Sequence, residues 1–383
     1  HGAVETPAAT AYWHDDRLEL WLATQAPGLA RDAAARAAGI DTDRVIVHAM
    51  LVGGGFGAAL EHDVAAQAAV LAQKLRRPVQ LMWSRGEALR HDRPRAPAKA
   101  RMAARLAANG MILGWQAKIA TPATGRELAA RLMPGDPLRR LAAGLPGGAD
   151  GYAMAGAVPP YRIPALAIDH HPADIAVATG HLRGGAHGYT AFFTECFIDE
   201  LAHQADSEPM SYRIGMLGGD ARLARCLSTV GALGGWDGGV VGSGQGIACH
   251  RLAGSQIAVL AEVHVADGGR VRVDRLVAAA DCGRTINPDV VRQQIEGGLV
   301  FGAAMATGCT TGYRDGLATT RLYGDLNLPI LATTPEVTVE LIQSDAEPGG
   351  VGDLGVPAVA AAVANALRAV TGARVRRLPL GVS

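Results

Sequence analysis

VIVHAMLVGGGFGAALEHDVAAQAAVLAQKLRRP, residues 45–78, places an apolar run, a glycine-rich loop and a helical pattern in direct succession. The apolar run over 45–52 predicts a strand, and apolar residues recur at helical spacing from Val64 to Leu75. Backbone N–H groups at such a strand-to-helix junction point towards an anion, and the helix dipole adds to the attraction. The loop lacks the dinucleotide fingerprint and the Lys-Ser/Thr pair of a P-loop, so it predicts either an anion-binding loop or a tight structural turn.

On both sides of this stretch, apolar residues with periods of 2 and 3.6 predict further strands and helices. The strands are expected at 17–24, 78–85, 112–120, 257–265, 270–280 and 336–342, and the helices at 187–204, 288–307 and 356–370. A turn at 267–269 joins two strands in a hairpin that alternates apolar and polar residues, and residues 121–160 are expected to form an irregular connection or a small helical insertion. These elements predict an α+β protein with two mixed α/β domains, at residues 1–155 and 156–383.

The composition excludes several classes of protein. The 383 residues carry 36 basic and 36 acidic side chains, and this balance argues against nucleic-acid or membrane-surface binding, which needs positive charge. The five cysteines are scattered without a C-x-x-C, which excludes an iron–sulfur cluster or zinc site built from the thiols of this chain alone. No apolar run is long enough to span a bilayer, so we expect no transmembrane segment. No leader is visible in this chain, and the compartment is left open between bacterial periplasm and cytoplasm.

Two further glycine-rich loops carry side chains that can do chemistry. In GHLRGGAHG, residues 180–188, Arg183 can bind an anionic group and the two histidines can titrate; the alternative is a solvated arginine with surface histidines. In EPGGVGDLGVP, residues 347–357, Asp353 stands between glycines before a predicted helix, whose dipole favours the charged carboxylate. The alternative is that Asp353 is the helix N-cap, which needs no catalysis. A single amide, Gln25, follows the first predicted strand and can both donate and accept hydrogen bonds.

A series of segments extends these observations over nearly the whole chain. They are TQAP at 24–27, GGGFG at 53–57, SRGEALRHD at 84–92, FFTECFIDELAH at 192–203, DCGRTINPDVVRQQIEGGLVFG at 281–302, GGVGDLGVPAVAAAVANAL at 349–367 and TGARVRRLPL at 371–380. In this order they resemble the molybdopterin-binding subunit of the xanthine dehydrogenase/aldehyde oxidase family, and most closely its isoquinoline 1-oxidoreductase beta-subunit branch. The resemblance covers the carboxy-terminal half of that subunit.

The resemblance implies a chemistry and a set of partners. The family hydroxylates an aldehyde or an N-heterocycle with water as the oxygen source, and a carboxylate acts as the base. It uses a molybdopterin cofactor, for which the cytosine dinucleotide form is a candidate here, and the metal has no direct protein ligand. For this chain the resemblance implies a separate chain for the amino-terminal half and an iron–sulfur subunit that takes the electrons, with the clusters only on that partner.

The resemblance also assigns roles to residues by position. Asp353 would be the base, Gln25 would contact an oxo ligand of the metal, and Arg183 would lie on the substrate or cofactor side. The loop residues expected beside the metal are Gly54, Gly55, Phe56 and Gly57; those expected at the pterin or its phosphate are Gly254, Ser255, Gln256 and Gln294; those expected to line the substrate pocket are Leu182, Arg183 and His187.

Departures from the family pattern leave a second interpretation open. The family base is a glutamate, and Asp353 is shorter by one methylene, roughly 1.5 Å; a misplacement of about 1 Å can cost about a hundredfold in rate. Leu182 replaces an aromatic residue and Ala58-Ala59 stands where the branch often has charges, so a roomier and less polar pocket is expected. The alternative is a non-catalytic or cofactor-free scaffold that retains the fold. A simple nucleotide-binding module is disfavoured because no ribose-binding acid follows GGGFG at a suitable spacing.

Three glycines, Gly297, Gly298 and Gly302, lie on the helix predicted over 288–307. Such glycines allow another backbone to approach closely. Together with apolar strands that lack an amino-terminal partner half, they predict surfaces that another chain covers.

Overall fold

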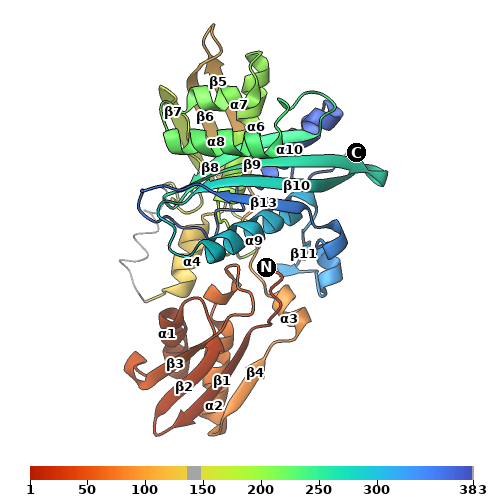
Figure 1. Ribbon diagram of the computed structural model, residues 1–383. Coiled ribbons are helices and arrows are strands. Elements are labelled where there is room, and N and C mark those ends of the chain that lie inside the picture. Colours follow the sequence, from red (N-terminus) through yellow and green to blue (C-terminus); the bar gives the residue numbers. More distant parts are fainter. Residues whose placement is uncertain (136–147, 382–383) are drawn as a thin grey trace.

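The computed structural model describes residues 1–135 and 148–381, and it has two lobes (Figure 1). The first lobe, red to orange in Figure 1, lies below the larger second lobe. Helices and sheets are mixed in both lobes, which confirms the α+β class that the sequence predicts. Among the described residues, no helix is both long and apolar enough to cross a membrane.

The first lobe consists of a four-stranded sheet with two long helices packed against it. Its elements are β1 (Ala8–His14), β2 (Arg17–Ala23), α1 (Pro27–Ala38), β3 (Val45–Met50), α2 (Asp63–Leu75), β4 (Val79–Met82) and α3 (Arg85–Arg90). The strand order is β3-β2-β1-β4, and β2 and β3 are parallel. Leu18, Leu20 and Leu22 alternate along β2 and are buried in one core with the alanines of α1 and α2. The two strands end on the same side, so Gln25 and the first glycine loop leave the sheet together.

The second lobe consists of a central sheet that is covered on both faces. Its strands are β8 (Gln245–Leu252), β9 (Ser255–Ala266), β10 (Arg270–Asp281) and β13 (Glu336–Leu341), in the order β13-β10-β9-β8. One face packs on α9 (Pro288–Thr307) and α10 (Val359–Thr371). The other face packs on α7 (Pro209–Met216), α8 (Ala221–Gly234) and a second sheet of β5 (Lys99–Leu106), β6 (Ile112–Thr121) and β7 (Ala165–Pro172). The remaining elements are α4 (Thr124–Leu132), α6 (His187–Gln204), β11 (Tyr313–Arg314) and β12 (Leu317–Ala318).

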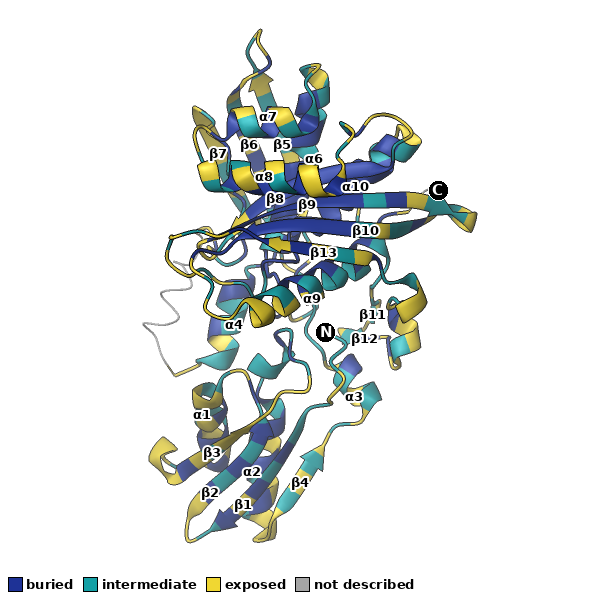
Figure 2. Cartoon of the chain, viewed as in Figure 1, coloured by how far each residue is buried: buried dark blue, intermediate teal, exposed yellow. Residues whose placement is uncertain are grey.

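The strand β9 divides its side chains between the two cores. Ile257 and Val259 pack with α9 and α10, whereas Ala258 and Leu260 pack with α8. Both faces are therefore buried, as the dark blue colour of the central sheet shows in Figure 2. The predicted hairpin and its turn at Asp267–Gly269 are confirmed, but the expected alternation of apolar and polar residues is wrong over 255–261, because helices cover the second face as well.

The hydrophobic cores cross the expected boundary at residue 155. Ile112 and Trp115 of β6 are buried in the same core as Leu223 of α8. The assignment of residues 1–155 and 156–383 to two cofactor-binding domains stays a prediction. Part of the connection expected over 121–160 forms α4, and its residues 136–147 lie outside the described residues.

The glycines of α9 do allow close backbone approach, as predicted, but the partner is this chain itself. A Cβ on Gly298 would lie 2.8 Å from Gly355 Cα, and a Cβ on Gly302 would lie 2.9 Å from Val359 Cβ. For Gly298 and Gly302 the expectation that they face another chain is therefore wrong, because the third glycine loop and the start of α10 already cover them. Gly297 is exposed, so for this residue the expectation stays a prediction.

We predict that Gly246→Ala destabilises the second lobe by at least about 1–3 kcal/mol, the cost of overpacking a filled interior. A Cβ on Gly246 of β8 would overlap the backbone of α10 at Ala362 and Ala366. Gly114→Ala, on β6, is the matched control, because its Cβ would meet its nearest neighbours at 3.9 Å and should change the melting temperature little. Equal melting temperatures for the two variants would contradict the tight packing of α10 on the sheet.

Candidate functional site

A continuous series of contacts joins Gln25 to Asp353 across the three glycine loops. Gln25 follows β2, its backbone N–H donates to Ala59 O at 3.0 Å, and its side-chain Oε1 accepts from the Gly57 N–H at 3.1 Å. Gly57 lies against the backbone of His181, and His181 Nε2 lies 3.8 Å from Asp353 Oδ2. The structure thus brings Gln25 and the first loop together, as the two strand ends predict.

The first loop, residues 53–57, needs glycine at two positions for different reasons. A Cβ on Gly55 would lie 2.6 Å from Gln25 Oε1 and would displace that side chain, whereas Gly57 has a φ of +110° and a Cβ there would overlap the His181 carbonyl. Phe56 also has a positive φ, +54°, a strained conformation for a non-glycine residue that is typical of functional sites. Its ring centroid lies 5.4 Å from that of Phe301 on α9, so the loop reaches the second lobe.

Arg183 fastens the second loop to the other two. Its backbone N–H donates to Phe56 O at 2.8 Å, its Nε donates to Gly352 O at 2.8 Å, and its Nη2 donates to Gln294 O at 2.8 Å and to Gln294 Oε1 at 3.2 Å. The residue is 8% exposed, so the alternative of a solvated arginine is wrong. Burial lowers the pKa of the guanidinium, and the nearby carboxylate of Asp353 opposes this shift. Leu182, its neighbour, is 9% exposed.

Asp353 lies in a turn and does not cap the following helix. Its backbone carbonyl accepts from the Val356 N–H at 3.1 Å, whereas α10 begins at Val359 with Ala358 at its N-cap and no side-chain cap. The N-cap alternative is therefore wrong, because two turns of chain separate the carboxylate from the helix. The Asp353 side chain is 32% exposed, which leaves it accessible to a small molecule.

The two histidines of the second loop are in different surroundings. His181 Nδ1 hydrogen-bonds the Tyr152 hydroxyl, and burial lowers the pKa of the His181 imidazole. His187 Nδ1 lies 2.8 Å from His250 Nε2 of β8. Burial lowers the pKa of both rings, that of His250 to about 3, with a further contribution from neighbouring His187.

A partly buried arginine, Arg95, lies behind the second loop and carries no sequence signal that would have identified it. Its Nη2 donates to the Arg183 carbonyl and its Nη1 lies 3.5 Å from Met305 Sδ, so both of these partners are neutral. A Cβ on Gly188 would lie 2.5 Å from Arg95 Nη1. Burial lowers the pKa of Arg95 to about 10. Arginine is frequent throughout this chain, so one more arginine in a proline-rich segment is not informative by itself.

Three of the residues predicted at the pterin or its phosphate, Gly254, Ser255 and Gln256, line an open pocket of about 610 Å³ on the second lobe, whereas Gln294 does not line it. Ser255 Oγ and Gln256 Oε1 are buried there without a hydrogen-bond partner among the described residues. The pocket is also lined by His187, Arg222 and Arg251. The two arginines pair with acids, Arg222 Nη2 with Asp281 at 2.7 Å and Arg251 with Asp220. The sequence patterns did not indicate either arginine, because neither lies in a glycine loop.

The third loop connects this pocket to Asp353. The Gly350 N–H donates to Ala253 O at 2.8 Å, and a Cβ on Gly349 would overlap Ser255 Oγ. Gln294 on α9 reaches the same loop through Arg183. The structure therefore brings together both predicted groups, the residues of the three loops and the residues of the β8–β9 turn.

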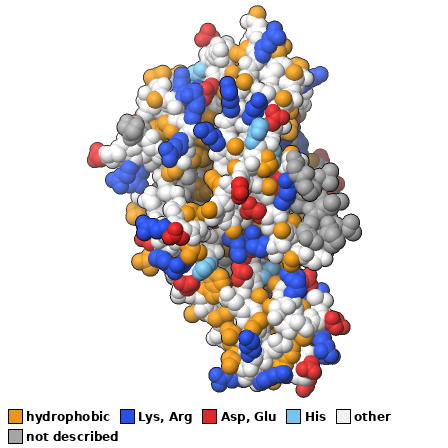
Figure 3. Space-filling view, turned by 180° about the vertical axis from the view of Figure 1, so that it is seen from behind, with side chains coloured by type: hydrophobic (Ala, Val, Ile, Leu, Met, Phe, Trp, Pro, Cys, Tyr) orange, Lys and Arg blue, Asp and Glu red, His pale blue; other side chains and the backbone are white. Residues whose placement is uncertain are grey.

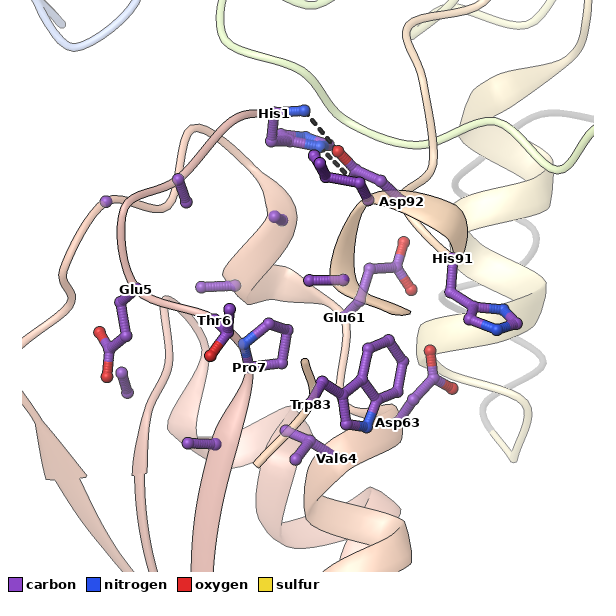
Figure 4. Close-up of a pocket in the computed structure, with 18 of the residues that line it drawn as sticks. His1, Glu5, Thr6, Pro7, Glu61, Asp63, Val64, Trp83, His91 and Asp92 are labelled. Carbon is purple, nitrogen blue, oxygen red and sulfur yellow. Dashed lines mark hydrogen bonds and ion pairs between the residues drawn. The ribbon is translucent and has the colours of Figure 1, made fainter. Parts of the chain in front are cut away.

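A second, smaller pocket of about 100 Å³ lies on the first lobe behind the first loop (Figure 4). Trp83, Pro7 and Val64 form its apolar wall, and His1 and Asp92 meet at its rim. The His1 imidazole also donates to the His181 carbonyl at 2.7 Å. Gln25, Arg183 and Asp353 do not line this pocket, but Gly54 of the first loop does, so the pocket adjoins the three-loop site without containing those three side chains.

Comparison with known families identifies two matching domains. Residues 1–127 match one family described as a molybdopterin cofactor-binding domain, and residues 246–335 match a second family with the same description. The first match contains Gln25 and the first loop, and the second contains Gly254, Ser255, Gln256 and Gln294.

Two curated relatives match the chain over almost all of its length. The isoquinoline 1-oxidoreductase subunit beta of Brevundimonas diminuta is 28% identical over 96% of this chain and 46% of its own length. The membrane-bound aldehyde dehydrogenase (pyrroloquinoline-quinone) of Gluconacetobacter polyoxogenes is 27% identical over 99% of this chain and 52% of its own length. The chain thus spans about half the length of the curated relatives it matches.

The fold is that of solved molybdenum hydroxylases. Quinoline 2-oxidoreductase from Pseudomonas putida 86 superposes on 99% of this chain and 73% of its own length with a TM-score of 0.80 and 13% identity. The aldehyde oxidoreductase of Desulfovibrio gigas superposes on 98% of this chain and 58% of its own length with a TM-score of 0.77 and 16% identity. At these identities the comparison concerns the fold alone.

We predict that His250 makes the protein less stable as the pH falls. Its pKa is ordinarily 6.5 and falls to about 3 in the fold, so below about pH 6.5 only the unfolded chain takes up this proton. Stability is then lost between about pH 6.5 and 3, at about 1.4 kcal/mol per pH unit. His250→Gln should flatten the dependence of the melting temperature on pH in this range, whereas His264→Gln, an exposed histidine on β9, should leave it unchanged. Parallel curves for wild type and His250→Gln would contradict the buried neutral imidazole.

Proposed function

We propose that this chain is part of a molybdenum hydroxylase. The premise is that it belongs to the xanthine dehydrogenase/aldehyde oxidase family of molybdopterin-binding subunits. The substrate class would be an aldehyde or an N-heterocycle, with water as the oxygen source. The observation that carries the proposal is the convergence of three glycine loops, so that Gln25, Gly57, His181 and Asp353 form one line of contacts.

The residues of the second lobe fit a molybdopterin cofactor. Ser255 Oγ and Gln256 Oε1 are buried polar atoms without a partner among the described residues, and they line a pocket with Gly254 and Arg222. Such atoms are costly unless a ligand or water satisfies them. Gly254, Ser255, Gln256 and Gln294 would hold the pterin and its phosphate, for which the cytosine dinucleotide form is a candidate. When bound, the cofactor would supply a metal centre for two-electron oxidation.

The first loop and Gln25 would lie beside that metal centre. The first loop presents its backbone to the site at Gly54, Gly55, Phe56 and Gly57. A side chain at Gly55 would meet Gln25, and one at Gly57 would meet His181. Gln25 uses Oε1 to accept from Gly57, which leaves its amide nitrogen as a donor towards the cofactor. The metal itself would have no direct protein ligand.

Asp353 would act as the base. Its carboxylate is one-third exposed and can accept a proton from a water molecule held beside it. Arg183 is buried and Arg95 is partly buried, and both cations are close enough to Asp353 for its charge to influence the pKa of each. They would stabilise negative charge that develops on the substrate or cofactor. Leu182 and Arg183 would border the substrate, whereas His187, also expected there, lines the pocket with Ser255 and Gln256.

We predict that Asp353→Asn lowers turnover by about a hundredfold or more, the usual contribution of a positioned base. Asp353→Glu, which restores the side-chain length of the family, should preserve or raise turnover. The melting temperature should change little in both, since Asp353 caps no helix. Turnover would be measured on the assembled protein with a panel of aldehydes and a panel of N-heterocycles as substrates. Equal turnover in wild type and Asp353→Asn would favour the non-catalytic scaffold.

Metal analysis of the same preparations supplies an independent control. Molybdenum content should be unchanged in Asp353→Asn and reduced in Gly55→Val, whose branched side chain would displace Gln25. One relative is named for pyrroloquinoline quinone, so quinone extraction distinguishes that cofactor from molybdopterin. Retention of full molybdenum content in Gly55→Val would contradict the place given to the first loop.

The chain would work with partners. The curated relatives are about twice as long, and we infer that the missing amino-terminal half of the fold and an iron–sulfur subunit complete the enzyme. Exposed apolar side chains gather at the end of the edge strand β3, where Met50 is 53% exposed and Leu51 is 96% exposed. They directly precede the first loop, so the missing half would cover them and reach the site. On the face of the molecule seen in Figure 3, basic, acidic and apolar side chains are mixed.

We predict that the chain made alone is inactive and self-associates, because an exposed apolar edge strand pairs with other chains. The double variant Met50→Ser, Leu51→Ser should reduce self-association in light scattering. The same variant should weaken co-purification with the missing half. A monodisperse and fully active isolated chain would contradict the proposed partner.

A further inference from the structure

His181 stands at the point where all three glycine loops meet, although the family pattern gives it no role. Its backbone lies against Gly57 of the first loop, and its ring faces Asp353 of the third loop. The Nδ1 atom hydrogen-bonds the Tyr152 hydroxyl, which belongs to none of the three loops. The ring is thus held on one side and presents Nε2 to the carboxylate on the other.

The contact with Tyr152 fixes which ring nitrogen carries the proton. Burial, with a smaller contribution from Asp353, raises the pKa of Tyr152, so its hydroxyl keeps its proton and can donate it to His181 Nδ1. A neutral imidazole that accepts at Nδ1 carries its own proton on Nε2. Burial keeps the ring neutral by lowering its pKa. The Nε2–H bond therefore points at Asp353.

The distance of 3.8 Å between His181 Nε2 and Asp353 Oδ2 is too long for a direct hydrogen bond. The gap is also too short for a bridging water, since two hydrogen bonds of about 2.8 Å meeting at a water molecule span about 4.5 Å. A small rotation of either side chain would close the gap to a direct hydrogen bond, in which Nε2–H donates to Asp353 Oδ2 and limits the position of the carboxylate.

We propose that His181 is a positioning residue for Asp353: its Nε2–H is directed at the carboxylate and limits the position of that group, and Tyr152 fixes the imidazole tautomer that this requires. The inference rests on the proposed function, in which Asp353 is the base. Asp353 takes the proton from water, while His181 keeps its own proton throughout. The pair offers a physical reason why a base shorter by one methylene can work here, because the carboxylate acts from a fixed position.

Four groups face the His181 side chain or its backbone. Asp353 raises the pKa of the imidazole, and Arg95 lowers it by its positive charge. Tyr152 hydrogen-bonds Nδ1, and the His1 ring donates to the His181 carbonyl. Loss of the Asp353 charge should therefore lower the pKa of His181 further, since burial and Arg95 would act unopposed.

The first measurement follows the chemical labelling of His181 by diethyl pyrocarbonate, which modifies the neutral imidazole, against pH. Labelling is read at the single residue by mass spectrometry on the assembled protein. In Asp353→Asn, which keeps the shape of the side chain, the midpoint should move to lower pH. An unchanged midpoint overturns the proposal. The result does not depend on turnover, so it is decisive even if the proposed activity is absent.

The second measurement compares turnover of two His181 variants. Glutamine places a donor near the position of Nε2 and leucine does not, so His181→Leu should lose about tenfold in kcat and His181→Gln should recover most of it. KM should change less than kcat in both. His264→Leu, an exposed histidine paired with Asp274, is the matched control and should keep wild-type kinetics. Equal losses in His181→Gln and His181→Leu overturn the positioning role, while the Asp353 variants test the proposed function separately.

Discussion

Arg183 is the residue on which the arrangement of the site depends. Its backbone N–H binds Phe56 of the first loop, and its guanidinium binds the carbonyls of Gly352 in the third loop and Gln294 on α9. A buried guanidinium is costly unless its donors are satisfied, and here the backbone carbonyls of Gly352 and Gln294 and the side-chain Oε1 of Gln294 accept from it. Any displacement of one loop would leave a buried donor unpaired, so the three loops are held in one relative position.

The glycines make this arrangement possible because the loops meet backbone to backbone. Gly57 lies on His181, Gly349 on Ser255 and Gly298 on Gly355, and at each contact a Cβ would overlap or crowd the facing atoms. The close approach brings Gln25, His181 and Asp353 within one site although they are far apart in the sequence. The doubly covered sheet of the second lobe supplies the rigid base, since α9 and α10 both anchor the third loop.

Much of the secondary structure could be predicted from local patterns. The helices at 187–204 and 288–307 are found at the expected residues, because long periodic segments with a clear end are the strongest signals. The strand β1 and the alanine-rich helix α1 were missed, since alanine and glycine give weak periodicity. The start of α10 was placed three residues early, and this error is what made Asp353 a candidate N-cap.

The sequence by itself determined the α+β class, the three glycine loops and, through their order, the resemblance to molybdopterin cofactor-binding domains that the comparisons support. Only the tertiary structure decided what joins the loops. The burial of Arg183, the place of Arg95 behind the second loop, the line from Gln25 through His181 to Asp353, and the unpartnered Ser255 and Gln256 depend on contacts between distant segments. A local pattern reports the backbone that a segment prefers, whereas burial and hydrogen bonding across loops follow from how the segments pack together.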